Sequence, residues 1–393
     1  MKSKCLLIDA CQSTPYYNNC LLDALVKKGQ KVVYATTPFP HAESPIPPDV
    51  EVRYCFFYLA RLLGGITSSH HLLRRVLRAI EYPFDLLALV IYVFVKRIKL
   101  VHYMWATLPT FDLCAMWLLK KSGCKIVYTA HDPFPHEFKK SHLKKFARIY
   151  HRVDHIIALT EFTRNELRNR TNIPLERISI IPHGDFDYVL SQCSYNEALA
   201  EKIRASANGR KVITFLGRIL PYKGLQYFIQ AFSSIKRLKP DTFFLVAGSA
   251  RFVNKKKWKE MMGQSCEPED LYLDLRYFPV ADMKAYLAVT DVLVLPCVSG
   301  ASQSGNTIMA YSSGIPVIST DVGGLAEMVE DGQSGYVVPP KNPQAIAEAV
   351  AKCIEPDNYM RMSENARRLA ADKYSWDNIA EQTIEVYRKF ITG

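Results

Sequence analysis

The chain has 393 residues, of which 49% are hydrophobic and 22% charged. This composition is typical of a globular protein, and no stretch is polar enough to be expected to stay disordered. At roughly 100 to 200 residues per domain, the length indicates two or three domains, and two is the simplest expectation.

The formal net charge of +12 is concentrated in clusters. Three anionic partners could account for it: anionic lipid, nucleic acid and phosphorylated ligands. Because no nucleic-acid recognition motif is present, no nucleic-acid partner is expected. Solvated cations that only aid solubility are the alternative for each cluster. The clusters are Arg74, Arg75 and Arg78; Lys96, Arg97 and Lys99; Lys139, Lys140, Lys144, Lys145 and Arg148; and Lys255, Lys256, Lys257 and Lys259.

Apolar runs are too short for a signal peptide or a membrane span. Asp9 interrupts the run Cys5–Ile8, which predicts a buried strand. The longest run, Leu86–Val95, is about half of what a helix needs to cross a bilayer. The ten cysteines include no Cys-x-x-Cys pair, so we expect reduced thiols in a cytoplasmic protein, with neither disulfides nor a structural metal.

Along the first half of the chain, apolar strand-like runs alternate with helical stretches, which predicts a parallel sheet covered by helices on both faces. Thr160 is the expected N-cap of a helix over Glu161–Asn169, with Thr163 and Glu166 as a capping-box alternative one turn later. The other predicted helices here span Asn18–Lys28 and Phe111–Lys121, and the predicted strands span Lys4–Ile8, Lys31–Ala35, Leu100–Tyr103, Lys125–Thr129 and His155–Ala158.

The same alternation restarts in the second half. Residues 181–208 carry turn formers and no strong strand, which predicts a linker. The expected domains are therefore residues 1–190 and 191–375, with a last helix over 376–393 packing back on the first domain. Predicted strands span Lys211–Leu216, Thr242–Ala247, Asp291–Leu295 and Pro316–Ser319, and predicted helices span Gly224–Lys236, Ala281–Val289, Thr307–Ser313 and Trp376–Phe390.

Two such domains facing each other would form a cleft, because open parallel sheets bind ligands beyond the carboxyl ends of their strands. The stretch Gly217–Gly224 follows a strand, carries Arg218 and Lys223, and leads into a helix. A glycine, two cations and a helix N-terminus suit a diphosphate without a metal. From spacing alone, ordinary surface cations are an equal alternative.

Two further loops have the same character. Residues 295–309 contain a Gly/Ser-rich loop between a strand and a helix, and residues 319–327 contain a second strand, loop and helix. Small residues at such places let backbone N–H groups face an anion. Three loops of this kind in one half indicate a binding site for a phosphorylated ligand.

These motifs resemble the retaining glycosyltransferases of family four, which have the α/β GT-B fold with two Rossmann-like domains facing a central cleft. The resemblance extends from about residue 125 to 345, plus the last helix, and residues 1–124 match only in pattern. It is carried by Tyr128–His136, Ile180–Gly184, Phe215–Gly224, Ala288–Pro296, Gly314–Glu327 and Asp331–Val338.

The resemblance implies roles for particular residues. Arg218 and Lys223 would hold the donor diphosphate, and His131 would contact the donor sugar near the reacting carbon, with a structural histidine as the alternative. Donor contacts are expected from Gly217, Gln303, Ser304, Gly305, Asn306 and Thr307.

Two departures from the family pattern stand out. Many relatives have two glutamates with seven residues between them, one for the sugar and one for the ribose. Counting back from Gly314, these positions are occupied here by Ala301 and Met309. The Ser-Gln-Ser-Gly-Asn stretch resembles a subgroup associated with surface-polysaccharide assembly, in which residues 303–306 could replace some lost contacts. The usual Gly-Gly donor loop is also absent, and residues 13–17 occupy its place.

Two other features have a weaker meaning. Asp185 and Asp187 match an Asp-x-Asp metal motif, but their linker position predicts a turn. Residues 72–95 join arginines to an apolar run, which indicates either an amphipathic acceptor or membrane surface, or a buried helix with a basic edge.

The resulting hypothesis is a metal-independent retaining hexosyltransferase without a cofactor. It would move sugar from a nucleotide diphosphate to a lipid-linked or polysaccharide acceptor, peripherally at an anionic membrane on its cytoplasmic side, in surface glycan biosynthesis. The alternatives are a catalytically silent module that partners an active enzyme and a nucleotide-sugar epimerase of similar fold.

Overall fold

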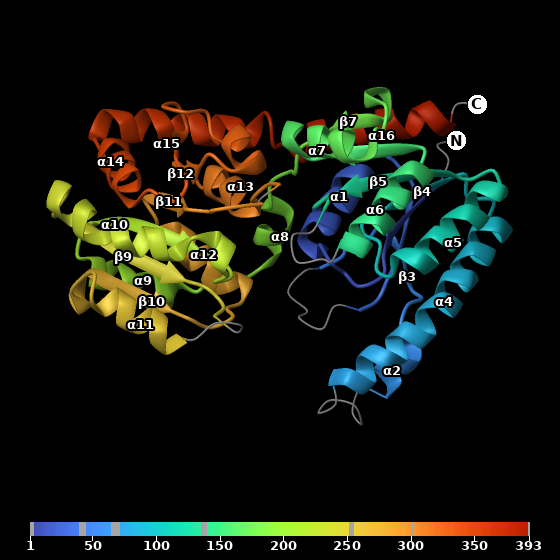
Figure 1. Ribbon diagram of the computed structural model, residues 1–393, viewed down its shortest axis with the longest axis horizontal. Coiled ribbons are helices and arrows are strands. Elements are labelled where there is room, and N and C mark those ends of the chain that lie inside the picture. Colours follow the sequence, from blue (N-terminus) through green and yellow to red (C-terminus); the bar gives the residue numbers. More distant parts are fainter. Residues whose placement is uncertain are drawn as a thin grey trace. The chain divides into compact units, whose positions relative to one another are not determined.

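A computed structural model describes residues 4–38, 45–63, 71–134, 140–250, 255–300 and 302–391 (Figure 1). The chain forms two compact units, each described by itself below. The amino-terminal unit comprises Met1–His183 and Trp376–Gly393, and the carboxyl-terminal unit comprises Gly184–Ser375. The first boundary thus lies at residue 183, whereas the sequence analysis placed it at residue 190.

The amino-terminal unit is built on a seven-stranded sheet with the order β3-β2-β1-β4-β5-β6-β7. Every pair of neighbouring strands is parallel. Most of these strands are fully buried because helices cover both faces, which explains their continuous apolar runs. The strands are β1 (Cys5–Asp9), β2 (Val32–Thr36), β3 (Glu51–Tyr54), β4 (Leu100–Tyr103), β5 (Lys125–Ala130), β6 (His155–Ala158) and β7 (Ile178–Ile180).

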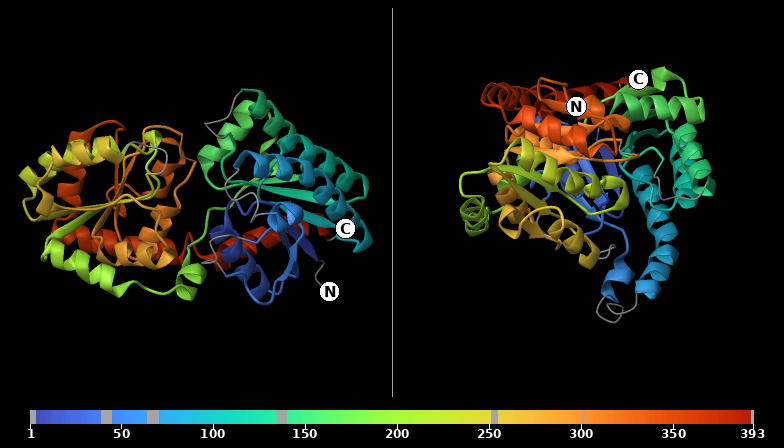
Figure 2. Two further views of the ribbon diagram at one scale, coloured as in Figure 1. Left: turned by 90° about the horizontal axis from the view of Figure 1, so that it is seen from below. Right: turned by 60° about the vertical axis from the view of Figure 1, so that its left-hand side comes forward.

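Helices cover this sheet in two layers (Figure 2). Helices α1 and α16 pack together on one face, and α4, α5 and α6 lie side by side on the other. The helix expected at the end of the chain therefore packs within the amino-terminal unit. The helices are α1 (Pro15–Lys27), α2 (Tyr58–Leu62), α4 (His71–Val95), α5 (Pro109–Lys121), α6 (Lys140–Arg152), α7 (Glu161–Thr171), the 3₁₀ turn η1 (Leu175–Arg177) and α16 (Trp376–Ile391).

The carboxyl-terminal unit has a six-stranded parallel sheet with the order β10-β9-β8-β11-β12-β13. Its core includes the stacked rings of Phe232 and Phe244, with centroids 3.8 Å apart. The strands are β8 (Lys211–Leu216), β9 (Thr242–Ala247), β10 (Leu271–Asp274), β11 (Val292–Leu295), β12 (Val317–Thr320) and β13 (Gly335–Val338). The helices and 3₁₀ turns are α8 (Asp187–Gln192), α9 (Glu197–Ala207), η2 (Pro221–Lys223), α10 (Leu225–Leu238), α11 (Lys255–Gly263), η3 (Pro268–Asp270), α12 (Val280–Val289), α13 (Gly305–Ser312), η4 (Gly323–Met328), α14 (Pro343–Cys353) and α15 (Pro356–Ala371).

The predicted doubly wound pattern is confirmed in both units, and the expected N-cap is present because the Thr160 hydroxyl accepts the N–H of Thr163 at 3.1 Å. The linker prediction is wrong for most of residues 181–208, which form α8 and α9. Helix α9 has its own N-cap, since the Asn196 side chain accepts the N–H of Leu199 at 3.1 Å. It packs on α12 as part of the carboxyl-terminal unit.

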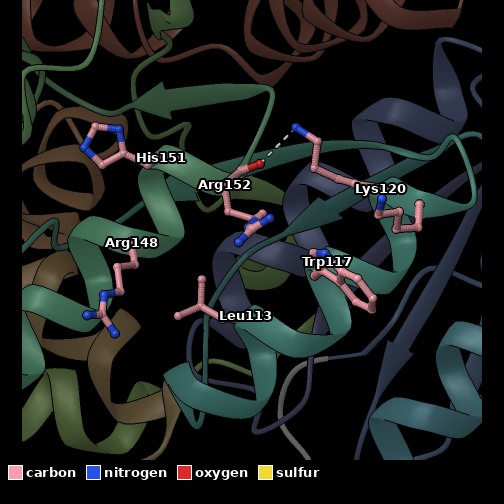
Figure 3. Close-up of a pocket in the computed structure, with 7 residues that line it drawn as sticks. Leu113, Trp117, Lys120, Arg148, His151 and Arg152 are labelled. Atoms are coloured by element: carbon pink, nitrogen blue, oxygen red, sulfur yellow. Dashed lines mark hydrogen bonds between the residues drawn. The ribbon is translucent and has the colours of Figure 1, made fainter.

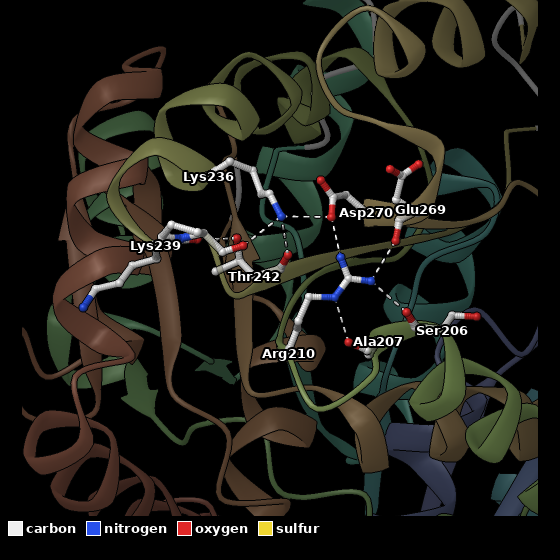
Figure 4. Close-up of polar contacts among 9 residues, drawn as sticks. Ser206, Ala207, Arg210, Lys236, Lys239, Thr242, Glu269 and Asp270 are labelled. Carbon is white, nitrogen blue, oxygen red and sulfur yellow. Dashed lines mark hydrogen bonds and ion pairs between the residues drawn. The ribbon is translucent and has the colours of Figure 1, made fainter.

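A buried charge network joins α9, α10, β9 and β10 at the amino edge of this second sheet (Figure 4). The buried Asp270 carboxylate accepts hydrogen bonds from Arg210 and, at 2.9 Å, from Lys236. Arg210 also donates to the carbonyl oxygens of Ser206, Ala207 and Glu269, each at 2.8 Å. One carboxylate therefore balances two poorly exposed cations.

Replacing Asp270 with alanine should lower the free energy of unfolding by about 3 kcal/mol, because it leaves two largely buried cations without a counter-charge. Chemical denaturation of both proteins would measure the difference. Glu260→Ala is the matched control, since Glu260 pairs with Lys256 only on the surface at 3.8 Å and should change stability by less than about 0.5 kcal/mol. Equal effects of the two substitutions would contradict the structural role of Asp270.

Candidate functional site

In the carboxyl-terminal unit, loops that follow neighbouring strands approach each other closely at glycines. After β8, the N–H of Gly217 donates to the Ala247 carbonyl at 3.0 Å. A Cβ atom on Gly248, just after β9, would lie 1.8 Å from the Gly217 carbonyl oxygen. No side chain fits there, so Gly248 is required for this approach. Sequence reasoning did not single out Gly248, although a glycine directly after a strand is a recognisable signal.

The loop that carries Lys223 packs onto the chain just beyond β11. Gly224 has a φ of +70°, and a Cβ atom there would lie 1.8 Å from the Pro296 carbonyl oxygen. The N–H of Val298 donates to the Tyr222 carbonyl at 2.8 Å, which fixes the same contact from the other side. Lys223 is therefore held half-buried at the carboxyl ends of β8 and β11.

Charge also places Lys223 near the second predicted loop. Burial raises the pKa of the Cys297 thiol, and the positive charge of Lys223 opposes this rise. Arg218, five residues earlier on the same loop, is exposed. The loop thus offers one half-buried and one exposed cation at the edge where parallel sheets bind ligands.

The N-terminus of α13 joins this loop. The Asn306 side chain donates to the Leu216 carbonyl at 2.5 Å, and a Cβ atom on Gly217 would lie 3.0 Å from the same amide nitrogen. Gly217 and residues 304–306 are therefore brought together. The first turn of a helix leaves backbone N–H groups without partners inside the helix, which suits an anion.

The other predicted residues of this stretch differ in accessibility. Gln303 is half-buried, but the Thr307 hydroxyl is buried and has no hydrogen-bond partner among the described residues. The N–H of Thr307 donates to the Ser304 carbonyl at 3.1 Å. Thr307 therefore lies beneath the loop. Ala301 lies outside the described residues, and Met309 is buried in α13.

The third predicted loop differs from expectation. Residues 323–328 form the 3₁₀ turn η4 and not an α-helix, so the prediction of a strand, loop and helix over 319–327 is wrong in its last part. The loop is tied to the second one because the Thr320 hydroxyl donates to the Cys297 carbonyl at 2.6 Å. Its contribution is to support the chain beyond β11.

In the amino-terminal unit, His131 directly follows β5 and lies in a cluster of aromatic rings. The Tyr17 ring meets His131 edge-on with centroids 4.6 Å apart and meets His183 at 4.7 Å. Trp376 of the last helix closes the cluster at 5.2 Å from Tyr17. Of this cluster, only His131 was predicted as a site residue. The others were not, because contacts between segments this far apart in sequence leave no local signal.

The His131 ring is only 7% exposed, and its environment favours the neutral form. Burial lowers the pKa of His131 to about 3, with smaller contributions from the charges of His183 and His102. At neutral pH this imidazole is uncharged. It is therefore suited to hydrogen bonding with a hydroxyl and unsuited to acting as a cation toward a phosphate.

Residues 13–17, which stand in place of the Gly-Gly donor loop, are anchored by Asp9, a residue that the sequence analysis did not assign to the site. The buried Asp9 carboxylate, at the end of β1, accepts the N–H groups of Ser13 at 3.0 Å and Thr14 at 3.2 Å. It also accepts the Asn18 amide at 2.8 Å. Asp9 thus fixes residues 13–17, including the ring of Tyr17 that packs on His131.

The Asp-x-Asp pair forms the expected turn, because the Asp185 side chain accepts the N–H of Asp187 at 3.0 Å as α8 begins. Within the described ranges, no three His, Cys, Asp or Glu side chains are grouped so that they could hold a metal ion.

Together, two Rossmann-like units and a cationic strand-end loop beside a helix N-terminus are features of the GT-B fold. Comparisons with known proteins agree. Residues 17–184 match the family described as Glycosyltransferase Family 4, and residues 197–369 match Glycosyl transferases group 1. The chain belongs to the family-four-type glycosyltransferases with the GT-B fold.

Individual relatives are distant. An alpha-D-kanosaminyltransferase from Streptomyces kanamyceticus is 26% identical over 240 residues, 60% of this chain and 60% of that protein. The capsular polysaccharide biosynthesis glycosyltransferase CapM from Staphylococcus aureus is 25% identical over 60% of this chain and 62% of its own length. The matches thus span about three fifths of each relative's length.

Among solved structures, Anabaena HepE in complex with UDP superposes with a TM-score of 0.73 at 18% identity. The superposition covers 99% of this chain and 100% of that one. At this identity, the likeness establishes the shared fold.

Replacing Gly224 with alanine should destabilise the protein by about 1 to 3 kcal/mol more than Gly332→Ala. Gly332 is the matched control, because its φ of +71° equals that of Gly224 within a degree while nothing lies within 4 Å of its Cβ position. The difference in unfolding free energy between the two variants isolates the clash with Pro296. Similar values for both would show that the loop does not depend on this approach.

Proposed function

We propose that this chain is a retaining glycosyltransferase that moves a hexose from a nucleotide diphosphate to an acceptor hydroxyl. The observation that carries the proposal is the convergence of Lys223 and the N-terminus of α13 at the carboxyl ends of β8 and β11. Cations and helix N–H groups fixed in advance stabilise charge that develops during a reaction. Here that charge would appear on the diphosphate as its bond to the sugar breaks.

The roles proposed for the donor come from the family resemblance, and this geometry supports them. Arg218 and Lys223 bind the diphosphate, and Gly217 permits close approach of the backbone. Gln303, Gly305 and Asn306 contact the donor, while Ser304 and Thr307, both buried, support the turn from beneath. Neutral His131 hydrogen bonds to the donor sugar near its reacting carbon. No cofactor takes part, since the diphosphate leaves with the bonding electron pair, the acceptor oxygen forms the new bond, and the hydroxyl proton passes to the departing diphosphate.

The proposed acceptor is a lipid-linked or polysaccharide chain in surface glycan biosynthesis. The resemblance of residues 302–306 to a subgroup associated with surface-polysaccharide assembly supports it, as does the similarity to a capsular polysaccharide glycosyltransferase. We further propose that the chain acts peripherally at an anionic membrane on the cytoplasmic side, which the clusters of cations support.

A catalytically silent module is the second candidate, favoured by the apolar residues at positions 301 and 309. Hydrolysis or transfer of a nucleotide sugar by the purified chain would rule it out. Release of a free epimerised sugar would indicate an epimerase of similar fold.

Replacing Lys223 with alanine should lower kcat by roughly a hundredfold, about 2.7 kcal/mol, with a smaller change in donor affinity. The reason is that the lost cation interacts more strongly with the leaving diphosphate than with the intact donor. Lys223→Arg should not restore the rate fully, because a planar guanidinium replaces a compact charge.

Steady-state kinetics and thermal shifts with UDP and GDP would measure both parameters. Lys352→Ala, an exposed lysine of α14, is the control and should behave as the parent protein. If folded Lys223→Ala kept the parent kcat, the loop after β8 would not bind the diphosphate.

Activity should survive EDTA, because the two cations of the loop after β8 would neutralise the diphosphate. The measurement is transfer after chelation, with a metal-dependent transferase in the same buffer as the control that must lose its activity. Complete loss of transfer activity on chelation, restored by manganese or magnesium, would contradict the proposed metal independence.

A further inference from the structure

Helix α4 has apolar side chains on its outer surface as well as its inner one. Its inner face, with Tyr82, Leu86, Leu89 and Val93, is buried in the core of the amino-terminal unit. Its outer face carries a row of exposed apolar side chains spaced three or four residues apart, which we call the α4 stripe. The stripe consists of Leu73, Val76, Ile80, Phe84, Leu87, Ile91 and Phe94, with exposed fractions of 46% to 69%.

A row of this length is unusual on a surface helix, whose outer face is normally polar. Exposed apolar patches of this kind mark surfaces that bind another body. In the described part of the chain, no helix is both long and apolar enough to cross a membrane. The exposed apolar row therefore indicates a surface along which the helix binds another body.

The exposed charges of helices α4, α5 and α6 have one sign, and Glu51 of β3, whose carboxylate accepts the Tyr92 hydroxyl of α4, is paired with Lys4. Helices α4, α5 and α6 contain three acidic residues, and each of them accepts a backbone hydrogen bond. Glu81 accepts the N–H of Ala60, and Asp85 accepts that of Phe57. Asp112 accepts the N–H of Leu108. No acidic side chain of these helices is exposed. Cations flank the stripe at both ends, with Arg74, Arg75 and Arg78 at one and Lys96, Arg97 and Lys99 at the other.

Helix α5 connects the stripe to a basic groove. Its outer residues Phe111, Trp117 and Leu118 are exposed, and α5 packs against α4 on one side and α6 on the other. The groove between α5 and α6 has a volume of about 860 Å³ (Figure 3). It is lined by Leu113, Trp117, Lys120, Lys121, Arg148, His151 and Arg152.

The charge of the groove is only partly neutralised. Lys120 donates to Asp154 at 3.2 Å, whereas Lys121, Arg148 and Arg152 take part in none of the ion pairs found among the described residues. A tryptophan beside exposed cations is the combination found where proteins meet the headgroup region of a bilayer.

A second pocket, of about 730 Å³, lies where the stripe ends. Phe94 and Val95 of α4 and Phe390 of α16 form its apolar wall, and Arg97, Lys99 and Lys125 supply its cations. It adjoins the amino ends of β4 and β5. His131 follows the carboxyl end of β5, at the opposite end of the strands, so this pocket is separate from the proposed catalytic site.

We propose that the outer face of α4, α5 and α6 docks on an anionic lipid bilayer. The α4 stripe, Phe111 and Trp117 enter the headgroup region, and the groove and the pocket receive lipid phosphates. An amphipathic helix of this kind lies in the plane of the interface. The inference rests on the membrane association proposed above and is independent of the transfer reaction.

A second copy of the chain fits this face poorly. Both ends of the stripe are positive, so parallel and antiparallel pairing alike would bring cations against cations. An anionic bilayer instead satisfies the apolar row and both cation clusters together.

The test is sedimentation with vesicles of phosphatidylcholine containing a third of phosphatidylglycerol, compared with pure phosphatidylcholine. Leu87→Gln with Ile91→Gln should weaken binding to the anionic vesicles at least tenfold. Arg148→Gln with Arg152→Gln should weaken it about thirtyfold, since each cation near an anionic surface contributes about 1 kcal/mol and each 1.4 kcal/mol is tenfold. All four side chains are exposed, so unchanged thermal unfolding should accompany the loss.

Matched controls lie in the other unit. Leu238→Gln with Met360→Gln removes two exposed apolar groups, and Lys341→Gln with Lys352→Gln removes two exposed cations that lie outside the cation clusters. Both double variants should bind the anionic vesicles as the parent does, within about twofold to threefold. Equal losses in the controls would show a general charge or hydrophobic effect and overturn the assignment to this face.

The remaining outcomes are separable because vesicle binding needs neither donor nor acceptor. If the parent protein does not bind anionic vesicles, the proposed membrane association itself is wrong. Parent binding that both face variants retain would overturn this inference alone. A stripe variant that changes the oligomeric state by gel filtration, with vesicle binding intact, would identify a second copy as the occupant.

Discussion

Close backbone approach at glycines is the constraint on which the carboxyl-terminal unit depends at its strand ends. Side chains at positions 224 and 248 would each come within 1.8 Å of a carbonyl oxygen of the neighbouring loop. Their absence lets the loops after β8, β9 and β11 form one layer. That layer holds Lys223 half-buried and lets Asn306 reach the Leu216 carbonyl. Cations fixed in this way need little rearrangement when a diphosphate gains charge.

The amino-terminal unit has a comparable constraint built from a carboxylate and aromatic rings. Asp9 holds residues 13–17 through backbone N–H groups, and this orders Tyr17 against His131, His183 and Trp376. The last helix of the chain thereby becomes part of the surroundings of a residue that follows β5. Such packing explains why His131 stays neutral, because its pKa reflects burial first.

Much of the fold could be predicted because its signals are local. Buried strands such as β8 and β9 appear as short apolar runs, and the loop at 217–224 is recognisable from its glycines and cations between a strand and a helix. The contacts of Gly248 and Trp376 could not be predicted, since each depends on a partner distant in sequence. The partners of Asp9 are near in sequence, but no sequence pattern shows that its carboxylate turns back to bind them. The stretch 181–208 misled because its polar residues include an Asn N-cap followed by a helix. Residues 72–95 left two readings open, and α4 combines both: one face is buried and the other is exposed and apolar.

The single sign of charge on the α4, α5 and α6 layer has a consequence for how the molecule would move. A protein held by that face would diffuse laterally, so its encounters with a lipid-anchored acceptor would occur in two dimensions and at a raised effective concentration. Each docked copy would also gather anionic lipids beneath its cations, so neighbouring copies on the same leaflet would compete for those lipids. The layer that draws the chain to a bilayer would therefore also limit how densely its copies collect there.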